Sequence, residues 1–296
     1  MTVRQFERAP ATLPLYLRAA LPAIPVVGNL PGVRHVPGSV PDVTLVRAGV
    51  TTDLADLAAY ATVCGFSIRD TLPVTYPHMA AFGLQMTLMT DTAFPFAPMG
   101  LVHLRNSITQ HRPIAVTESY AVSVQATHLR EHPKGRLIDI VSVARVGAET
   151  VWEETMTLFR RGGGGAAEAQ RAPLDDVEAP AGTATWSLDA GLGRRYGAVS
   201  GDRNPIHLSR LSAKAFGFPR QIAHGMWTKA RALAAIENRL PGAYTVDAEF
   251  RRPILLPAEV TFGHVVEGDR QLFGVTGHAR GDKPAPTHLV GRVVPA

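Results

Sequence analysis

The chain of 296 residues repeats itself, and this repeat constrains its fold more than any other feature of the sequence. The pattern Tyr-x-x-Val-x-Gly occurs at Tyr60–Gly65 and again at Tyr196–Gly201 with identical spacing. Arg-Pro-Ile follows at residues 112–114 and at 252–254, which is 52 residues after the first tyrosine and 56 after the second. Self-similarity of this kind indicates a duplicated structural unit. We therefore expect two domains with the same fold.

A stretch rich in Gly, Ala and Pro separates the two halves. It begins at Arg161-Gly162-Gly163-Gly164-Gly165 and continues to about Gly182 without apolar periodicity, which is typical of a flexible linker. Four glycines also occur in phosphate-binding loops, but no Gly-Lys-Ser/Thr follows and no helix pattern begins there. The predicted organisation is an N-terminal arm, a first domain, a linker and a second domain, over residues 1–39, 40–160, 161–182 and 183–296.

Each half is predicted to combine helices with an antiparallel sheet, because its strand-forming segments follow one another through short turns. Helical runs over residues 53–63 and 192–199 each end near a glycine. A helix over residues 225–240 has an apolar stripe, and residues 82–89 are its predicted counterpart in the first half. The predicted strands are residues 101–108, 120–129, 137–146, 150–160, 244–251, 259–266, 272–278 and 288–294.

Composition and charge limit the partners and the location of the protein. The net charge is +5 with scattered arginines, which favours an anionic small ligand, such as one that carries phosphates, over nucleic acid. The single cysteine, Cys64, excludes an internal disulfide and indicates a reducing compartment, so we expect a cytoplasmic protein. The apolar residues 13–27 are interrupted by Arg18 and three prolines, so no membrane span is predicted there. We expect these residues to form a short helix and an extended arm that pack on the body of the protein.

A turn in the second half carries the residues best suited to chemistry. Ser200-Gly201-Asp202-Arg203-Asn204-Pro205-Ile206-His207 places a carboxylate and an imidazole five residues apart, around an Asn-Pro break that disfavours a regular helix. Alone, Asp202 is typical of a turn and His207 of a structural histidine. Together they suit acid–base work on a bound water. The first half has Phe66 in place of Asp202 and, without gaps, Thr71 in place of His207, so one copy alone keeps the pair.

The segment Ile222-Ala223-His224-Gly225-Met226 adds a second element of the site. Gly225 begins the long helix, where a backbone N–H has no partner within the helix and a glycine lets an oxygen atom approach. This predicts an oxyanion site for a carbonyl or thioester oxygen. We interpret His224 as a packing or hydrogen-bonding group at the helix start. A zinc site from His207 and His224 lacks a third ligand at a recognisable spacing, so no metal is predicted.

Three segments closely resemble the hydratase motif of MaoC-like (R)-specific enoyl-thioester hydratases, which have the hotdog fold: Tyr196-x3-Ser200-Gly201-Asp202-x-Asn204-Pro205-Ile206-His207, Phe216-Gly217-Phe218-Pro219 and Ile222-Ala223-His224-Gly225-Met226. The first half also resembles these proteins at residues 72–77 and 94–100. With two related halves and one motif, the chain looks like the double-hotdog (3R)-hydroxyacyl-thioester dehydratases of actinobacterial type. The resemblance implies an α+β double hotdog, with two antiparallel sheets each wrapped around a long central helix.

The resemblance also implies a reaction, the reversible addition of water to a trans-2-enoyl thioester to give the (3R)-hydroxyacyl thioester. Asp202 would be the main base on the water and His207 its partner, Asn204 would orient the water, and the Gly225 N–H would polarise the thioester carbonyl. No cofactor is implied. The stretch Arg231-Ala232-Leu233-Ala234 lacks the serine that some single-hotdog relatives carry on this helix. Substrate contacts are expected from Ser200, Gly201, Ile206, His224, Phe66 and Arg252.

Several alternatives stay open on the sequence. The substrate carrier is coenzyme A or an acyl-carrier protein, and its acyl group is a short chain, a long chain or a bulky steroid-like group. Phe66, Phe82 and Met86 would line the room for a long chain. The chain would act as a monomer that forms a pseudo-dimer, or as a homodimer. The rival functions are a hotdog acyl-thioesterase and a non-catalytic thioester-binding subunit.

Overall fold

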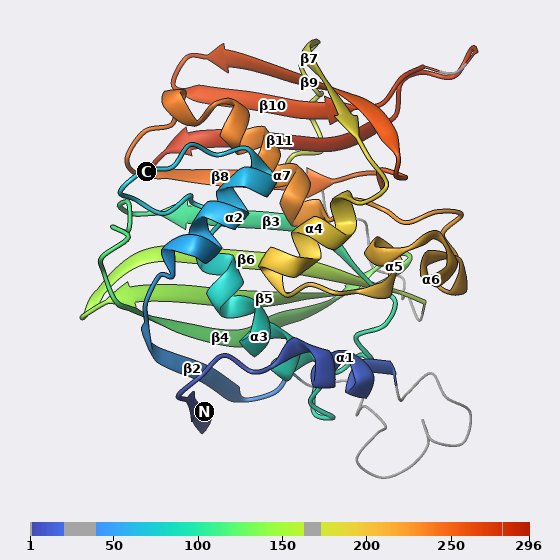
Figure 1. Cartoon of the computed structure of the whole chain (residues 1–296). Helices are drawn as coiled ribbons and strands as arrows, with labels where there is room; N and C mark the ends of the chain where they lie inside the picture. Colours follow the sequence, from blue (N-terminus) through green and yellow to red (C-terminus); the bar gives the residue numbers. More distant parts are fainter. Residues whose placement is uncertain (1, 21–39, 163–172, 280) are drawn as a thin grey trace.

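One continuous sheet of eleven strands forms the body of the molecule within residues 2–20, 40–162, 173–279 and 281–296, which the computed structural model describes (Figure 1). The strand order is β1-β2-β4-β5-β6-β3-β8-β11-β10-β9-β7. The first half contributes β1 (Thr2–Phe6), β2 (Val43–Val50), β3 (Leu101–Gln110), β4 (Tyr120–His132), β5 (Gly135–Val146) and β6 (Glu149–Arg161). The second half contributes β7 (Gly182–Leu188), β8 (Tyr244–Phe250), β9 (Ala258–Glu267), β10 (Arg270–Thr276) and β11 (Thr287–Pro295).

The two halves meet edge to edge between β3 and β8. These strands pair antiparallel from Arg105 opposite Glu249 to Gln110 opposite Tyr244. Two separate sheets were expected, and the structure corrects this, because each half presents an edge strand whose backbone groups pair with those of the other. All other ladders are antiparallel as well, except that β1 runs parallel to β2.

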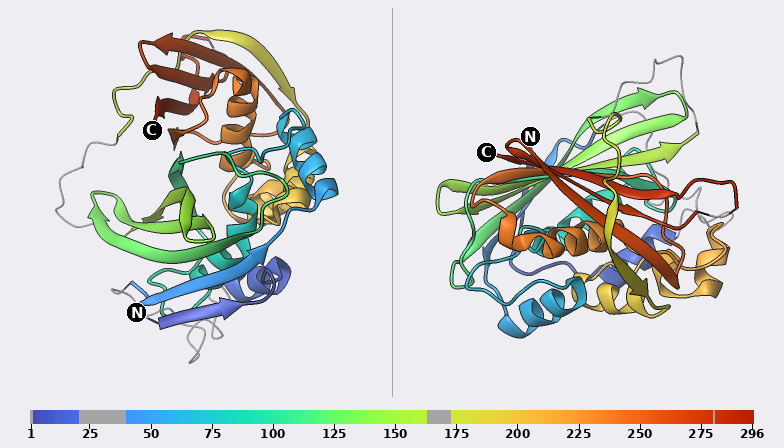
Figure 2. Two further views of the ribbon diagram at one scale, coloured as in Figure 1. Left: turned by 90° about the vertical axis from the view of Figure 1, so that its left-hand side faces the viewer. Right: turned by 90° about the horizontal axis from the view of Figure 1, so that it is seen from above.

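The sheet curves around the helices (Figure 2). In the first half α3 (Pro77–Met89) packs on β2, β4 and β5, and in the second half α7 (Gly225–Ala235) packs on β10. The helices α2 (Leu54–Cys64) and α4 (Leu192–Ser200) contact each other in front of them. The predicted helix over residues 225–240 is shorter than expected, since a 3-10 turn, Glu237–Arg239, replaces its last part.

The predicted arm contains β1 and the helix α1 (Thr12–Ala20), which contacts α3. Residues 21–39 of the predicted arm and 163–172 of the predicted linker lie outside the described residues. The described end of the linker is anchored, because the Arg251 guanidinium donates hydrogen bonds to the carbonyls of Leu174 and Val177. Among the described residues, no helix is long and apolar enough to cross a membrane.

The two halves correspond residue by residue up to Gly65 and Gly201, and after these glycines their alignment needs a gap. The Leu72 N–H bonds to the Ile114 carbonyl at 2.8 Å, and the Ala223 N–H bonds to the Ile254 carbonyl at 3.0 Å. The bridge at Thr71 therefore corresponds to the bridge at Ile222, and the prediction that Thr71 replaces His207 is wrong. The first half lacks the segment that holds the short helices α5 (Pro205–Leu208) and α6 (Arg210–Ala215) in the second half.

Candidate active site

The turn with Asp202 and His207 is positioned by α4 and α5. Helix α4 ends because Gly201 takes a left-handed conformation (φ 75°) that favours glycine. Asn204 then begins α5, and its side chain accepts a hydrogen bond from the Ile206 N–H at 3.4 Å. Pro205 occupies the first position of α5, where its missing N–H is not needed. The chain thus leaves one helix and enters another within a few residues.

Two glycines of α4 let this turn lie against the helix. A Cβ atom at Gly193 would stand 2.0 Å from the His207 carbonyl oxygen, and one at Gly197 would stand 2.8 Å from the Asp202 carbonyl oxygen. Both distances are shorter than a real Cβ contact. The spacing of four residues places both glycines on one face of α4. Their lack of side chains therefore sets how close the site comes to α4.

The two carboxylate oxygens of Asp202 have different surroundings. Oδ1 accepts hydrogen bonds from the Tyr16 hydroxyl at 2.5 Å and from the Asn204 N–H at 3.1 Å. In the described part of the chain Oδ2 accepts none, and it lies 3.8 Å from His224 Nε2. Burial alone would raise the pKa of Asp202, but His224, His207, the Tyr16 hydroxyl and the Asn204 N–H hold it below its usual value. Asp202 is therefore an ionised carboxylate with one oxygen available.

His207 is buried and its tautomer is fixed. Nδ1 donates a hydrogen bond to the Ile222 carbonyl at 2.8 Å. Burial lowers the pKa of His207 and outweighs the attraction of Asp202 and the Ile222 carbonyl, so the ring is neutral near pH 7. A neutral ring with a proton on Nδ1 carries a lone pair on Nε2. His207 thus offers an acceptor to the site.

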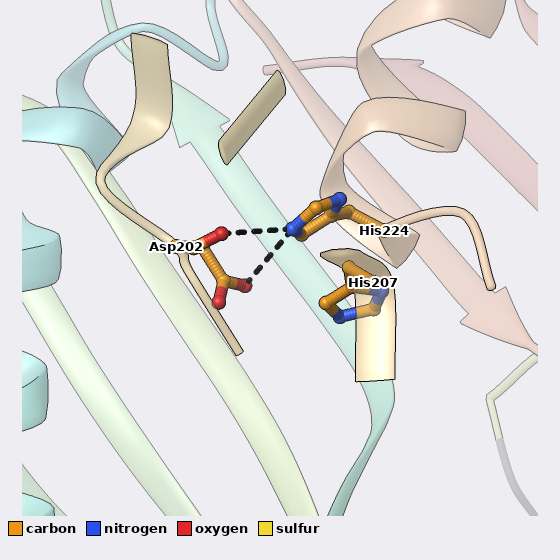
Figure 3. Close-up of side chains that lie close together, drawn as sticks. All are labelled: Asp202, His207 and His224. Atoms are coloured by element: carbon orange, nitrogen blue, oxygen red, sulfur yellow. Dashed lines mark hydrogen bonds and ion pairs between the residues drawn. The ribbon is translucent and has the colours of Figure 1, made fainter. Parts of the chain in front are cut away.

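His224 lies between the turn and the helix α7 and touches both members of the pair (Figure 3). Its Nε2 donates to the Asp202 main-chain carbonyl at 3.0 Å, and its ring stacks on His207 with centroids 3.6 Å apart. Burial, and next the neighbouring His207, lowers the pKa of His224 to about 3. His224 is therefore a neutral group that fixes the backbone of Asp202.

Asp202, His207 and His224 also form a group that could hold a metal ion, with one ligand atom of each within 4.8 Å of the others. The third ligand that the spacing did not reveal is thus Asp202. A metal needs ring nitrogens with free lone pairs. The His224 nitrogen that faces Asp202 is Nε2, and it carries the proton that is donated to the Asp202 main-chain carbonyl. This nitrogen therefore has no lone pair for a metal, and the arrangement suits acid–base chemistry better.

A cavity of about 500 Å³ opens beside these residues. It is lined by most of the predicted site residues, namely Ser200, Asp202, Asn204, Ile206, His207, His224, Gly225 and Arg252. Apolar side chains of the first half form much of its wall, among them Phe82, Met86, Met89, Met156 and Leu158. Asn204, Ile206 and Arg252 thus border the same space as the Asp202–His207 pair.

Two predicted substrate contacts lie elsewhere. Gly201 does not line the cavity, because its left-handed turn points its carbonyl at the Thr12 hydroxyl, which donates to it at 3.0 Å. Phe66, which was predicted to line the acyl room, does not border this cavity either. Phe66 stacks on the buried Tyr60 at 6.3 Å and borders a second, smaller cavity.

Gly225 begins α7 at the edge of the main cavity. A Cβ atom there would lie 3.1 to 3.2 Å from the Phe250 ring, which also lines the cavity. Its N–H belongs to the first turn of the helix, where such groups have no partner within the helix and the dipole is positive. A carbonyl oxygen in the cavity can therefore accept a hydrogen bond from this N–H.

Sequence reasoning missed three titratable cavity residues that come from the first half. Tyr16 belongs to α1, His78 to α3 and His103 to β3, and all three line the cavity. His78 Nδ1 bonds to the buried Glu154 at 2.9 Å. No periodicity or motif marks these residues, because each reaches the site through a contact between segments far apart in the chain.

Comparisons with known proteins agree with the resemblance of the motif. Residues 178–284 match the MaoC like domain. The 3-hydroxyacyl-thioester dehydratase X of Mycobacterium tuberculosis is 41% identical over 261 residues, which cover 88% of this chain and 90% of that protein. The 3-hydroxybutyryl-CoA dehydratase of Methylorubrum extorquens is 38% identical over 96 residues, 32% of this chain and 60% of that protein.

Solved structures show the same architecture. The crystal structure of HtdX of Mycobacterium tuberculosis superposes with a TM-score of 0.75 at 36% identity, over 86% of this chain and 100% of that one. A conserved hypothetical protein of Mycobacterium tuberculosis with a double hotdog fold gives 0.54 at 14% identity, over 87% of this chain and 95% of that one. The second likeness concerns the fold alone.

Proposed function

The chain belongs to the family of MaoC-like dehydratases, and we propose that it adds water reversibly to trans-2-enoyl thioesters to give (3R)-hydroxyacyl thioesters. One observation carries the proposal. The free Asp202 Oδ2 and the His207 Nε2 lone pair border the same cavity as the Gly225 N–H. Two acceptors for a water and one donor for a thioester oxygen are what this addition requires.

Asp202 and His207 can hold one water between them. Their ligand atoms lie within 4.8 Å, a separation that two hydrogen bonds of ordinary length through one water can bridge. As the water oxygen attacks C3, Asp202 takes a proton from it and His207 accepts its second hydrogen bond. The electrons of the double bond move toward the thioester oxygen, where the Gly225 N–H stabilises them. Asp202 then gives this proton to C2, which completes the addition and restores the carboxylate, and dehydration reverses these steps.

The rest of the cavity suits an acyl thioester. Its wall of Phe82 and methionines supports an apolar acyl chain, and methionines adapt to chains of different shape. Arg252 is exposed at the cavity and suits the phosphates of coenzyme A or of an acyl-carrier protein. Arg251 is less suited, since its guanidinium already bonds to Glu249 and to the end of the linker. The β3–β8 junction supports a pseudo-dimer within one chain.

The test is an absorbance assay with crotonyl-CoA and a long-chain enoyl-CoA. The wild type should hydrate at least one of them without releasing a thiol. Asp202→Asn keeps the side-chain volume but removes the base, so kcat should fall on the order of 10³-fold. Absence of hydration of both substrates, or release of free thiol, would contradict the proposal and favour a binding subunit or a thioesterase.

A further inference from the structure

We propose that Tyr16 is a positioning residue for this reaction: the N-terminal helix α1 closes the site, and the Tyr16 hydroxyl holds the Asp202 carboxylate so that Oδ2 faces the water. The inference rests on the proposed function and deepens it. It assigns a role at the site of the second half to a residue 186 positions away in the sequence. The matched MaoC like domain spans residues 178–284 and therefore does not contain it.

The arm that carries Tyr16 is anchored on both sides of the helix start. Upstream, β1 pairs in parallel with β2 from Thr2 opposite Val43 onward. Pro10 then lies so close to α3 that a Cβ atom at Gly83 would stand 2.9 Å from its carbonyl oxygen. The Thr12 hydroxyl donates to the Gly201 carbonyl at 3.0 Å. The first turn of α1 is thus fixed to the turn that carries Asp202.

Tyr16 is one helical turn further along α1, on the face that meets the cavity. Its half-buried side chain and the buried Ala19 both line the cavity wall. Its hydroxyl and the Asn204 N–H occupy Oδ1 of Asp202. Because both donors converge on one oxygen, the carboxylate cannot rotate without breaking two hydrogen bonds, and Oδ2 keeps its direction.

The electrostatics support a permanent donor at this position. Burial, and next the Asp202 charge, raises the pKa of Tyr16 far above its usual value, so the hydroxyl keeps its proton at any working pH. The titratable groups that face Asp202 are Tyr16 from α1, Tyr196 from α4, His207 from α5 and His224 at the start of α7. Among them, Tyr16 is the one whose hydroxyl donates to the carboxylate.

The experiment compares Tyr16→Phe with wild type in the full chain, by hydration kinetics against pH. A carboxylate that loses a hydrogen bond binds its proton more tightly, so the acid limb of kcat should move up by about one pH unit. At the wild-type optimum kcat should fall about tenfold with little change in KM, because the phenyl ring of phenylalanine still fills the place of the tyrosine ring. An unmoved acid limb together with wild-type kcat overturns the proposal.

Thr12→Val is the matched control. It removes the other hydrogen bond between α1 and the same turn, but its acceptor, the Gly201 carbonyl, does not titrate. The acid limb of Thr12→Val should stay at the wild-type position. An equal shift in both variants would show that docking of α1 matters and not the contact with Asp202, which also overturns the proposal.

A carboxyl-carbon NMR titration of Asp202 separates this inference from the proposed function. The pKa of Asp202 should be higher in Tyr16→Phe than in wild type, whether or not the protein hydrates the enoyl thioesters assayed. An unchanged titration rejects the role of Tyr16 even if hydration is observed. A shifted titration in a wild-type protein without hydration would reject the reaction while it keeps the contact.

Discussion

At the scale of single residues, the site depends on which lone pairs and protons are already used. The Ile222 carbonyl fixes the proton of His207 on Nδ1, and the Asp202 carbonyl fixes that of His224 on Nε2. Two stacked histidines therefore have opposite tautomers, and His207 is the one with its Nε2 lone pair available beside Asp202. Sequence spacing predicted that Asp202 and His207 share one space, but tautomers depend on carbonyls that the spacing does not reveal.

Gly225→Ala tests the oxyanion site at this scale. A methyl group would press on the Phe250 ring, which lines the cavity 3.1 to 3.2 Å away, so the ring or the start of the helix must shift. The backbone of Gly225 is helical, so alanine should leave stability almost unchanged. We expect kcat/KM for enoyl-CoA hydration to fall about tenfold. Removal of a single oxyanion donor costs 10²- to 10³-fold, and the variant keeps the backbone N–H of residue 225 but shifts it from its position, so the loss should be smaller. Wild-type kcat/KM with an unchanged urea midpoint would argue against this oxyanion site.

At the scale of elements, alternation and short turns predicted eight strands, and the structure contains all of them. Three strands, β1, β2 and β7, were not predicted. β1 is exposed along most of its length and forms because it pairs with β2, while most residues of β7 face solvent, so neither has an apolar pattern. The long helix was overextended because its apolar stripe continues through Ile236 and Leu240, which stay partly or fully buried after the helix has ended.

The site shows the same division between local and distant information. Asp202, Asn204 and His207 share one turn, so their cooperation is encoded locally and could be predicted. Tyr16 and much of the apolar wall of the cavity come from the other half, and no local pattern reports a contact across 186 residues. The ungapped comparison of the halves failed at Thr71 for a related reason, since a whole segment with α5 and α6 is absent from the first half.

Helix α4 offers the prediction at this scale. Gly193→Ala would place a methyl group 2.0 Å from the His207 carbonyl oxygen, a backbone atom that cannot move away without carrying the imidazole ring of His207 with it. We expect kcat to fall tenfold or more and stability to fall by about 1–3 kcal/mol, as for other overpacked contacts. Gly242→Ala is the control, because a Cβ atom there meets nothing within 4 Å. Steady-state kinetics and urea unfolding of both variants check this, and equal behaviour of the two would contradict it.

At the scale of the whole molecule, a buried polar network joins the two halves beneath the β3–β8 junction. Lys229 of α7 is fully buried, and its ammonium donates to Asn106 Oδ1 at 2.6 Å, to the Asn106 carbonyl at 3.1 Å and to the Val246 carbonyl at 3.1 Å. The Asn106 amide in turn donates to Glu154 at 2.8 Å. A charge so placed is stable when its partners are complete and costly when one is missing. The network therefore ties the packing of α7 to the first half.

The pH dependence of stability tests this network. Burial lowers the pKa of Lys229 to about 7, against the weaker opposite effects of Glu154 and Asp247, whereas the unfolded chain keeps the usual value of 10.5. Between these values the unfolded state binds the extra proton, so the contribution of Lys229 to stability rises as the pH goes from 7 to 10.5, falls as the pH is lowered over the same range, and is constant below 7. From pH 7 to 9.5 this contribution is about 3 kcal/mol.

Lys229→Met should be less stable than wild type at both pH values and should lack this rise, while the exposed Lys214→Met should keep it. Urea unfolding of the three proteins at both pH values measures how the free energy of unfolding changes with pH. The titratable groups that all three proteins share contribute equally, so they cancel when the proteins are compared. Parallel pH dependence of wild type and Lys229→Met would mean that Lys229 titrates in the folded protein as it does in the unfolded chain.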